Sequence, residues 1–216
     1  GAAARWSTNF NIGNPSTAQT RLTAGASLSG DELGGHTFST NMSLTVRPGP
    51  RWQLSARPSF IRGTDSQQYV TVRSGGRPET FGSRYIFAYI DRTQYGMEFR
   101  MSFTLKPDLN LDVYAEPFAA SGRYYDFGEL SVPQSLDRIT YGIDDGTQVA
   151  IDAAGNRTVT YGADTFPITN RDFNTTSFQS NVVLRWEWRP GSTVYLVWQQ
   201  NRDESEPVGR RAALAR

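Results

Sequence analysis

Residues 94–116 decide the fold, and they read Gln94-Tyr-Gly-Met-Glu-Phe-Arg-Met-Ser-Phe-Thr-Leu-Lys-Pro-Asp-Leu-Asn-Leu-Asp-Val-Tyr-Ala-Glu116. From Tyr95 to Leu105 every second residue is apolar, and the residues between them are polar, charged or glycine. The alternation resumes at Leu109, directly after Pro107-Asp108. Because successive side chains of a strand point to opposite faces, this pattern predicts a β-hairpin with one apolar and one polar face.

The same hairpin occurs at two other places in the chain. Arg47-Pro48 separates alternating stretches at 43–47 and 52–57, and Arg189-Pro190 separates stretches at 184–189 and 193–198. Each copy has a basic residue, a proline and a turn of two or three residues. A repeated hairpin of this kind predicts an antiparallel sheet with lipid on one side and water on the other.

Alternation along the whole chain predicts about ten strands. They are expected at 5–12, 20–28, 38–46, 52–60, 69–73, 84–91, 94–106, 109–116, 172–188 and 193–201. Pro58 lacks the backbone donor that a ladder needs, so we expect an edge, a bulge or a strand end there. Residues 84–91 are apolar on both faces, which favours a strand whose inner side also contacts protein.

A segment at about 120–171 interrupts the regular hairpins. It is rich in Gly, Asp, Thr and Tyr, and it contains short alternating stretches at 138–143, 148–152 and 158–161. Counting strands places the three Pro turns at one end of the sheet and this long loop at the other. Short turns at one end and long loops at the other are typical of outer-membrane barrels, so the long loop is expected to be extracellular.

Composition excludes several classes of protein. The 22 basic and 21 acidic residues nearly balance, so nucleic acid is not an expected partner. The absence of cysteine excludes disulfides, thiol nucleophiles and thiolate metal sites. No run approaches the roughly 18 apolar residues of a membrane helix, and no signal peptide precedes the first strand. Because the chain begins inside a predicted strand, we interpret it as a fragment.

These observations predict an all-β fold: an antiparallel, up-and-down transmembrane β-barrel segment that occupies residues 1–216, in the outer membrane of a bacterium. The best strands reach the roughly 9 to 11 residues that a tilted membrane strand needs. Trp52, Trp186 and Trp188 lie within a few residues of the Pro turns, as aromatic residues at a membrane interface do. The lipid bilayer is therefore an expected partner.

Charged residues on the wet face are candidates for lining the lumen of the barrel. They are Arg57, Glu98, Arg100, Asp112, Glu116, Arg185 and Glu187. Their signs are mixed, so pairing across strands is favoured over a role in ion selectivity.

Four stretches resemble a known family. They are 69–72, 81–91, 109–118 and 183–200, and they resemble the C-terminal region of the DUF5916 family over about residues 40–201. The resemblance implies an outer-membrane β-barrel without an established activity, commonly joined to an N-terminal carbohydrate-binding module of the family 9 type. That module is absent here, and the chain ends in Arg210-Arg-Ala-Ala-Leu-Ala-Arg216 rather than in the aromatic-ended strand of a complete barrel.

Catalytic and metal sites are poorly supported. His36 is the only histidine, and Asp112 and Glu116 are roughly 13 Å apart along one strand, too far for a glycosidase pair. A cross-strand pair of Glu98 with Asp112 is the closer alternative. Asp144-Asp145-Gly and Asp152 to Asn156 offer calcium ligands, but they match ordinary turns equally well. We predict no catalytic residues, no metal and no cofactor.

Three functions follow, in order of preference. The first is an outer-membrane barrel segment that acts as an anchor, a pore or a surface platform, with a carbohydrate link that rests on the resemblance. The second is a soluble or surface-exposed all-β carbohydrate-binding module, and the third is a domain associated with a glycoside hydrolase. Tyr124, Tyr125, Phe127, Tyr141 and Tyr161 in the long loop either stack on sugars or cover a small core of the loop itself.

Overall fold

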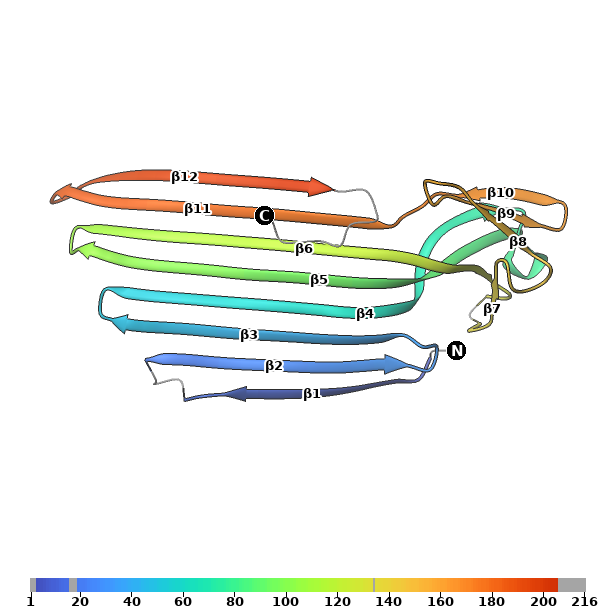
Figure 1. The fold of residues 1–216 in the computed structure, drawn as a ribbon, viewed down its shortest axis with the longest axis horizontal. Coiled ribbons are helices and arrows are strands. Elements are labelled where there is room, and N and C mark those ends of the chain that lie inside the picture. Colours follow the sequence, from blue (N-terminus) through green and yellow to red (C-terminus); the bar gives the residue numbers. More distant parts are fainter. Residues whose placement is uncertain (1–2, 16–18, 134, 206–216) are drawn as a thin grey trace.

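The computed structural model describes residues 3–15, 19–133 and 135–205, and it is built almost entirely of antiparallel β-strands (Figure 1). Eight long strands form one sheet in the order β1-β2-β3-β4-β5-β6-β11-β12. Their bounds are β1 Arg5–Gly13, β2 Thr20–Asp31, β3 His36–Gly49, β4 Trp52–Ser74, β5 Ser83–Lys106, β6 Leu109–Leu130, β11 Phe173–Arg189 and β12 Ser192–Ser205. The all-β, antiparallel, up-and-down prediction is confirmed.

Short elements occupy two of the three connections at one end of the sheet. A 3-10 turn, η1 (Pro78–Thr80), lies between β4 and β5, and β7 (Arg138–Thr140) pairs with β6. Strands β8 (Gln148–Ile151), β9 (Arg157–Tyr161) and β10 (Asp164–Ile168) form a separate three-stranded sheet, called the cap below. The three short stretches expected inside the long loop therefore do form strands. The loop itself is shorter than predicted, because β6 continues to Leu130.

The prediction of ten strands is wrong, because two pairs of predicted strands are continuous. Stretches 52–60 and 69–73 both belong to β4, and stretches 84–91 and 94–106 both belong to β5. Bulges between Asp65 and Gln68 and between Tyr69 and Thr71 shift the register of β4 against β5. Each bulge breaks the two-residue period of β4, so the interruption resembles a strand end in the sequence. In β5 the pairing is regular at Arg92 and Thr93, and these two polar residues separate a stretch that is apolar on both faces from an alternating one.

Pro58 lies at neither an edge nor an end, because β3 and β5 flank it inside β4. The paired residues of β3 and β4 instead pass from Asn41–Ser59 directly to Leu44–Ala56, without a register shift. The ladder between β3 and β4 is therefore interrupted beside the residue that lacks a donor.

All three Pro turns lie at one end of the sheet, as counting strands predicts (Figure 1). A bulge precedes each turn, at Val46/Gly49, Thr104/Lys106 and Glu187/Arg189. The repeated basic residue and proline therefore accompany a repeated local structure. In each copy the proline, which lacks a backbone donor, lies in the bulge or directly after it, where no ladder hydrogen bond is needed. We call this end the turn end and the opposite one the loop end.

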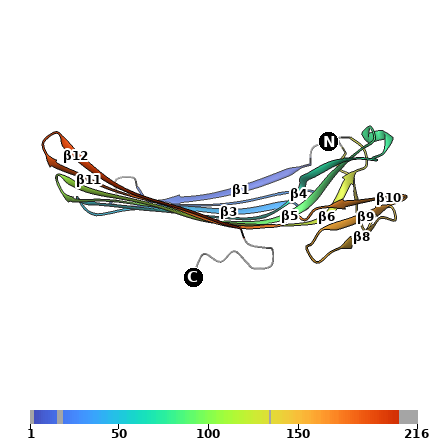
Figure 2. The ribbon, with the colours of Figure 1, turned by 90° about the horizontal axis from the view of Figure 1, so that it is seen from above.

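The buried core lies at the loop end, not under the middle of the sheet. It joins Val70, Ile86, Ala88 and Phe127 of the long strands to Tyr141 and to Val159, Phe166 and Ile168 of the cap. Ile86 and Ala88 have the same parity in β5 as Glu98 and Arg100, so the inner-side contact predicted for residues 84–91 is confirmed. Elsewhere the long sheet is a single, gently curved layer, as Figure 2 shows. Within the described residues, β1 and β12 each have one unpaired edge, so the sheet is open.

Candidate functional site

One face of the long sheet carries a continuous apolar surface that crosses all eight strands. We call it the apolar band, and it consists of every second residue of 6–12, 22–28, 38–46, 52–60, 95–103, 109–117, 182–186 and 194–198. The strand registers align these residues in rows, such as Leu54, Met101, Val113, Val182 and Trp198. Among the described residues, no element packs over this face (Figure 2).

The apolar band is larger than the exposed apolar patches of ordinary soluble proteins. Eight strands about 4.8 Å apart, contributing about 14 to 27 Å of their length each, give an apolar area of about 850 Å². The largest exposed apolar patch of a typical soluble monomer is about 300–600 Å². Trp6, Phe10 and Leu196 keep 54%, 65% and 62% of their surface exposed. This face needs an apolar partner of its own dimensions.

The apolar band crosses the strands at a slant. The row of paired residues that begins at Asn9 runs through Ser27, Ser39, Ile61, Gln94, Ala120 and Thr175 and ends at Ser205. Asn9 is the middle of the apolar stretch of β1, whereas Ser205 lies nine residues beyond Leu196, the middle of the stretch in β12. A shift of about 31 Å along the strands over about 34 Å across the sheet is a slope of about 40°.

Aromatic residues mark both margins of the apolar band. At the turn end, the rings of Trp52 and Phe103 stack with centroids 3.7 Å apart. At the other margin, the rings of Phe60 and Tyr95 lie 4.8 Å apart. Eight residues separate these margins in both β4 and β5, which is about 27 Å of strand.

The three predicted interfacial tryptophans all lie near the turn end. Trp186 belongs to the apolar band, opposite Leu109 and Val194. Trp188 lies in the bulge before Pro190, and the guanidinium of Arg189 is 4.5 Å from its ring centroid. Trp52 and Trp186 therefore both lie on the apolar face at the turn-end margin of the band.

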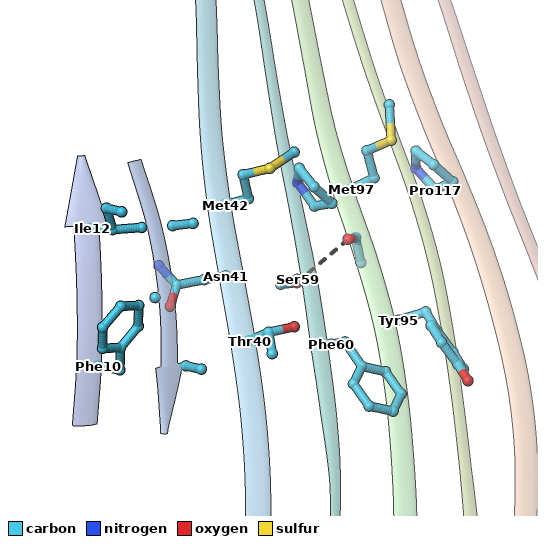
Figure 3. A pocket seen from close by; sticks show the side chains of 15 residues that line it. Phe10, Ile12, Thr40, Asn41, Met42, Ser59, Phe60, Tyr95, Met97 and Pro117 are labelled. Carbon is cyan, nitrogen blue, oxygen red and sulfur yellow. Dashed lines mark hydrogen bonds between the residues drawn. The ribbon is translucent and has the colours of Figure 1, made fainter. Parts of the chain in front are cut away.

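A shallow hollow of about 650 Å³ indents the apolar band (Figure 3). Small residues in β2, Ala24 and Ala26, form its floor beside the larger Phe10 and Ile12 of β1. Met97 stands between Pro58 and Pro117 of the two neighbouring strands. The pairing of β5 with β6 skips Met97 and Glu98, just as the pairing of β3 with β4 skips Pro58. The hollow thus lies where two ladders are interrupted.

The opposite face is polar, and it carries all seven predicted lumen residues. Glu98 is the centre of a small network, with its carboxylate 3.0 Å from Arg57 and 3.0 Å from Arg100. The guanidinium of Arg100 also lies 4.9 Å from the ring centroid of Tyr114, and the hydroxyl of Tyr114 donates to Glu116. The expected cross-strand pairing of opposite charges is therefore present at Arg57 and Glu98.

The other predicted polar residues lie apart from this network. Ser102 donates to Asp112 over 2.6 Å, and the backbone amide of Gly191 donates to Glu187 over 3.0 Å. Arg185 lies opposite Asn110 and Tyr195. Glu98 and Asp112 do not form the carboxylate pair considered from the sequence, because the register places Ser102 opposite Asp112.

A buried ion pair joins the cap to the long strands. Arg84, 6% exposed, donates to Glu129, 2% exposed, over 2.9 and 3.1 Å, and to Asp164 of β10 over 2.9 Å. Its guanidinium also lies 4.9 Å from the ring centroid of Tyr161. Burial alone lowers the pKa of Arg84, but its hydrogen bonds to the carboxylates of Glu129 and Asp164 outweigh burial, so the pKa lies above its ordinary value.

Two further arginines fasten the cap. Arg77, beside η1, pairs with Asp145 and donates to the hydroxyl of Tyr161 over 2.7 Å. Arg157 of β9 donates to the carbonyl of Tyr124 over 3.1 Å and lies 4.3 Å from the ring centroid of Phe127. Phe127 and Tyr141 are buried, so the loop aromatics cover a core here. The sequence patterns single out neither Arg84 nor Glu129. The only signal for Arg84 is its charge at the start of residues 84–91, which are apolar on both faces.

Tyr141 makes the cap sensitive to alkaline pH. Its hydroxyl donates to Glu129 over 2.8 Å, and burial beside this carboxylate raises its pKa well above the ordinary value. The stabilisation is complete below about pH 10, where unfolded tyrosine is neutral, and declines as the pH rises further. We expect Tyr141→Phe to weaken the alkaline loss of cap structure, measured by tyrosinate absorbance and protease cleavage against pH. Identical alkaline profiles for the two proteins would contradict this.

The candidate calcium ligands serve as turn formers. Asp144 accepts from the backbone amide of Thr140, and Asp152 accepts from those of Ala154 and Asn156. Within the described ranges, no three His, Asp or Glu residues gather in a way that would hold a metal ion. His36 lies at the start of β3, its ring nitrogen 3.3 Å from the carbonyl of Gly34.

Comparisons with known proteins add no relative. No family model, curated protein or solved structure matches this chain. In the part of the chain that the structure describes, no helix has the length and hydrophobicity to cross a bilayer. The stretch Arg210 to Arg216 lies outside the described residues.

Proposed function

We propose that this chain forms the wall of a bacterial outer-membrane β-barrel, with the apolar band against lipid and the polar face toward an aqueous lumen. The observation that carries the proposal is the slant of the apolar band. A membrane is a flat slab, so the apolar stretch of a tilted strand must shift steadily from one strand to the next. The slope of about 40° lies within the 35–45° tilt of membrane barrels.

Three other features support the same assignment. Aromatic pairs border the apolar band on both sides, as the girdles of outer-membrane barrels do. The band contains no charged side chain in its middle rows, whereas the opposite face carries Arg57, Glu98 and Arg100. The three Pro turns at one end are short, whereas the longest connection, residues 131–172, lies at the other end. Together these features favour a periplasmic turn end and an extracellular cap.

The position of the cap favours a role at the cell surface or in controlling passage through the lumen. It packs against Ile86 and Ala88, on the side of the sheet that carries the polar face. In a closed barrel it would therefore overhang the mouth of the lumen. Kinship with the DUF5916 family, a carbohydrate link and the lack of enzymatic activity remain predictions from the sequence.

Heat-modifiable gel migration tests the proposal. After extraction in detergent, we expect unheated protein to migrate differently from boiled protein and to partition with the membrane fraction. A soluble all-β module with its apolar face covered should instead remain in the aqueous fraction and show a single mobility.

A further inference from the structure

We propose that the polar face carries a binding site for short peptides with free termini, at the loop end of β1 to β5. The inference goes beyond the proposed function, because it concerns a pocket that does not depend on what surrounds the apolar band. The volume of this pocket is about 460 Å³, within the roughly 300–1,000 Å³ of ordinary ligand sites. In a barrel the pocket would lie on the lumen wall, near the extracellular mouth.

Four charged side chains of the polar face line this pocket, and they are Arg5, Asp31, Asp65 and Arg92. They belong to β1, β2, β4 and β5, so the two carboxylates lie between the two arginines along the sheet. Arg5 is directly opposite Asp31. Arg92 is two residues beyond Ile90, the partner of Asp65, and is therefore the diagonal neighbour of that carboxylate. Each arginine thus has an acidic residue on the adjacent strand.

Arg5 nevertheless has no counterion among the described residues. The comparable pair in the middle of the polar face, Arg57 and Glu98, is also directly opposite in register and forms an ion pair of 3.0 Å. The carboxylate of Asp31 instead accepts from two backbone amides of the turn that follows β2, over 2.9 and 2.8 Å. Because the turn holds this carboxylate, the guanidinium of Arg5 remains unpaired.

Arg92 is left without a counterion in the same way, within the part of the chain that the structure describes. The carboxylate of Asp65 accepts from the backbone amide of Gln67 over 2.9 Å, at the first bulge of β4. Gly63 lies directly opposite Arg92, and a Cβ atom there would be 2.3 Å from the carbonyl oxygen of His36. The close approach of β3 therefore requires a glycine, and no side chain separates Arg92 from the pocket on the β4 side.

These charges select a ligand that carries both signs. A guanidinium without a counterion binds a carboxylate through two parallel hydrogen bonds. Asp31 and Asp65 would repel a ligand that carries only negative charge, and they attract an ammonium group. A peptide with free termini supplies both groups, its α-carboxylate for an arginine and its α-ammonium for an aspartate.

The spacing of the charges suits a peptide of about three residues. Arg92 and Asp31 lie three strands apart, about 14 Å across the sheet, and the reach of the two side chains reduces that separation. An extended tripeptide spans about 10 Å. Ser29 and Thr37 lie in the same row as Arg92 and also line the pocket, so their hydroxyls are available to the peptide groups.

Calorimetric titration of the detergent-solubilised chain with triglycine tests the site. N-acetyl-triglycine lacks the ammonium group, triglycine amide lacks the carboxylate, and maltotriose is an uncharged polyhydroxylated probe. Arg92→Gln and Asp31→Asn each remove one charge, and the asparagine keeps an oxygen that the turn amides can use. Arg21→Gln is the matched control, because Arg21 is an exposed arginine of the same face that lies outside the pocket, opposite Thr45.

We expect triglycine to bind to the wild-type chain and to Arg21→Gln alike. Blocking either terminus, or introducing Arg92→Gln or Asp31→Asn, should weaken binding about tenfold, the loss expected for one charge-assisted hydrogen-bonded contact.

Three results would overturn the peptide site. Equal binding of triglycine and N-acetyl-triglycine would indicate a site for anions, and tighter binding of maltotriose would indicate a site for sugars. The third is the absence of triglycine binding, or an equal loss in Arg92→Gln and Arg21→Gln. Gel migration of the same protein before and after boiling reports on the membrane function separately. Heat-modifiable protein that binds no triglycine would therefore contradict the site and leave the proposed function standing.

Discussion

We expect Ala24→Arg to lower the free energy of unfolding from lipid vesicles by about 2–4 kcal/mol. This is the cost of placing an arginine on the lipid face near the middle of the bilayer. Ala24 belongs to the apolar band, near the middle of its stretch in β2, where the side chain would have no aqueous route. The measurement is urea-induced unfolding from vesicles, followed by tryptophan fluorescence.

Thr23→Arg is the matched control. Thr23 neighbours Ala24 in the same strand but points to the polar face, where it lies opposite Ser43. There the new guanidinium would enter water, so we expect a change below about 1 kcal/mol. Equal losses in the two variants would mean that the faces do not differ in their surroundings.

Glu129→Ala is expected to produce the largest loss in the cap, about 3–5 kcal/mol of local stability. The substitution would leave Arg84 buried with one exposed partner, Asp164, and would also leave the hydroxyl of Tyr141 without its acceptor. An uncompensated buried charge costs far more than a surface ion pair contributes. Cleavage of residues 131–172 by a dilute protease should therefore accelerate, because it follows the population of the open cap.

Asp164→Asn provides the comparison for this prediction. Asp164 bonds the same guanidinium as Glu129 does, but its side chain is 59% exposed, so we expect a cost below about 1 kcal/mol. Similar cleavage rates in Glu129→Ala and wild-type protein would contradict a structural role for the buried pair. Faster cleavage in Asp164→Asn than in Glu129→Ala would mean that the ion pair of Arg84 with Asp164 in β10, and not the pair with Glu129, holds the cap closed.

Period-two alternation made the faces and the two ends of the sheet predictable from the sequence. Each strand of the Pro-turn hairpins shows it, so Glu98 and Met97 were assigned to opposite faces and the three Pro turns to one end. Alternation failed where β4 bulges, near Gln68 and Tyr69, and this failure split β4 into two predicted strands. In β5 the division fell at Arg92 and Thr93, where a stretch that is apolar on both faces gives way to an alternating one although the pairing with β4 stays regular.

Two features needed the structure because they depend on register between strands. The slant of the apolar band is visible only when Asn9 can be followed to Ser205 through six intervening strands. The pairing of Arg84 with Glu129 joins residues 45 positions apart, across a bulge that no local pattern predicts. A sequence pattern indicates on which face of the sheet a residue lies. Its register, the position along the strand relative to the neighbouring strands, is set by turns and bulges.

Quenching of tryptophan fluorescence by brominated lipids tests the membrane account most directly. Four of the five tryptophans, Trp6, Trp52, Trp186 and Trp198, belong to the apolar band. We expect strong quenching by lipids brominated along the acyl chain and little quenching by aqueous iodide. Strong iodide quenching without any effect of brominated lipid, in folded protein that has been mixed with vesicles, would contradict contact between the apolar band and the bilayer.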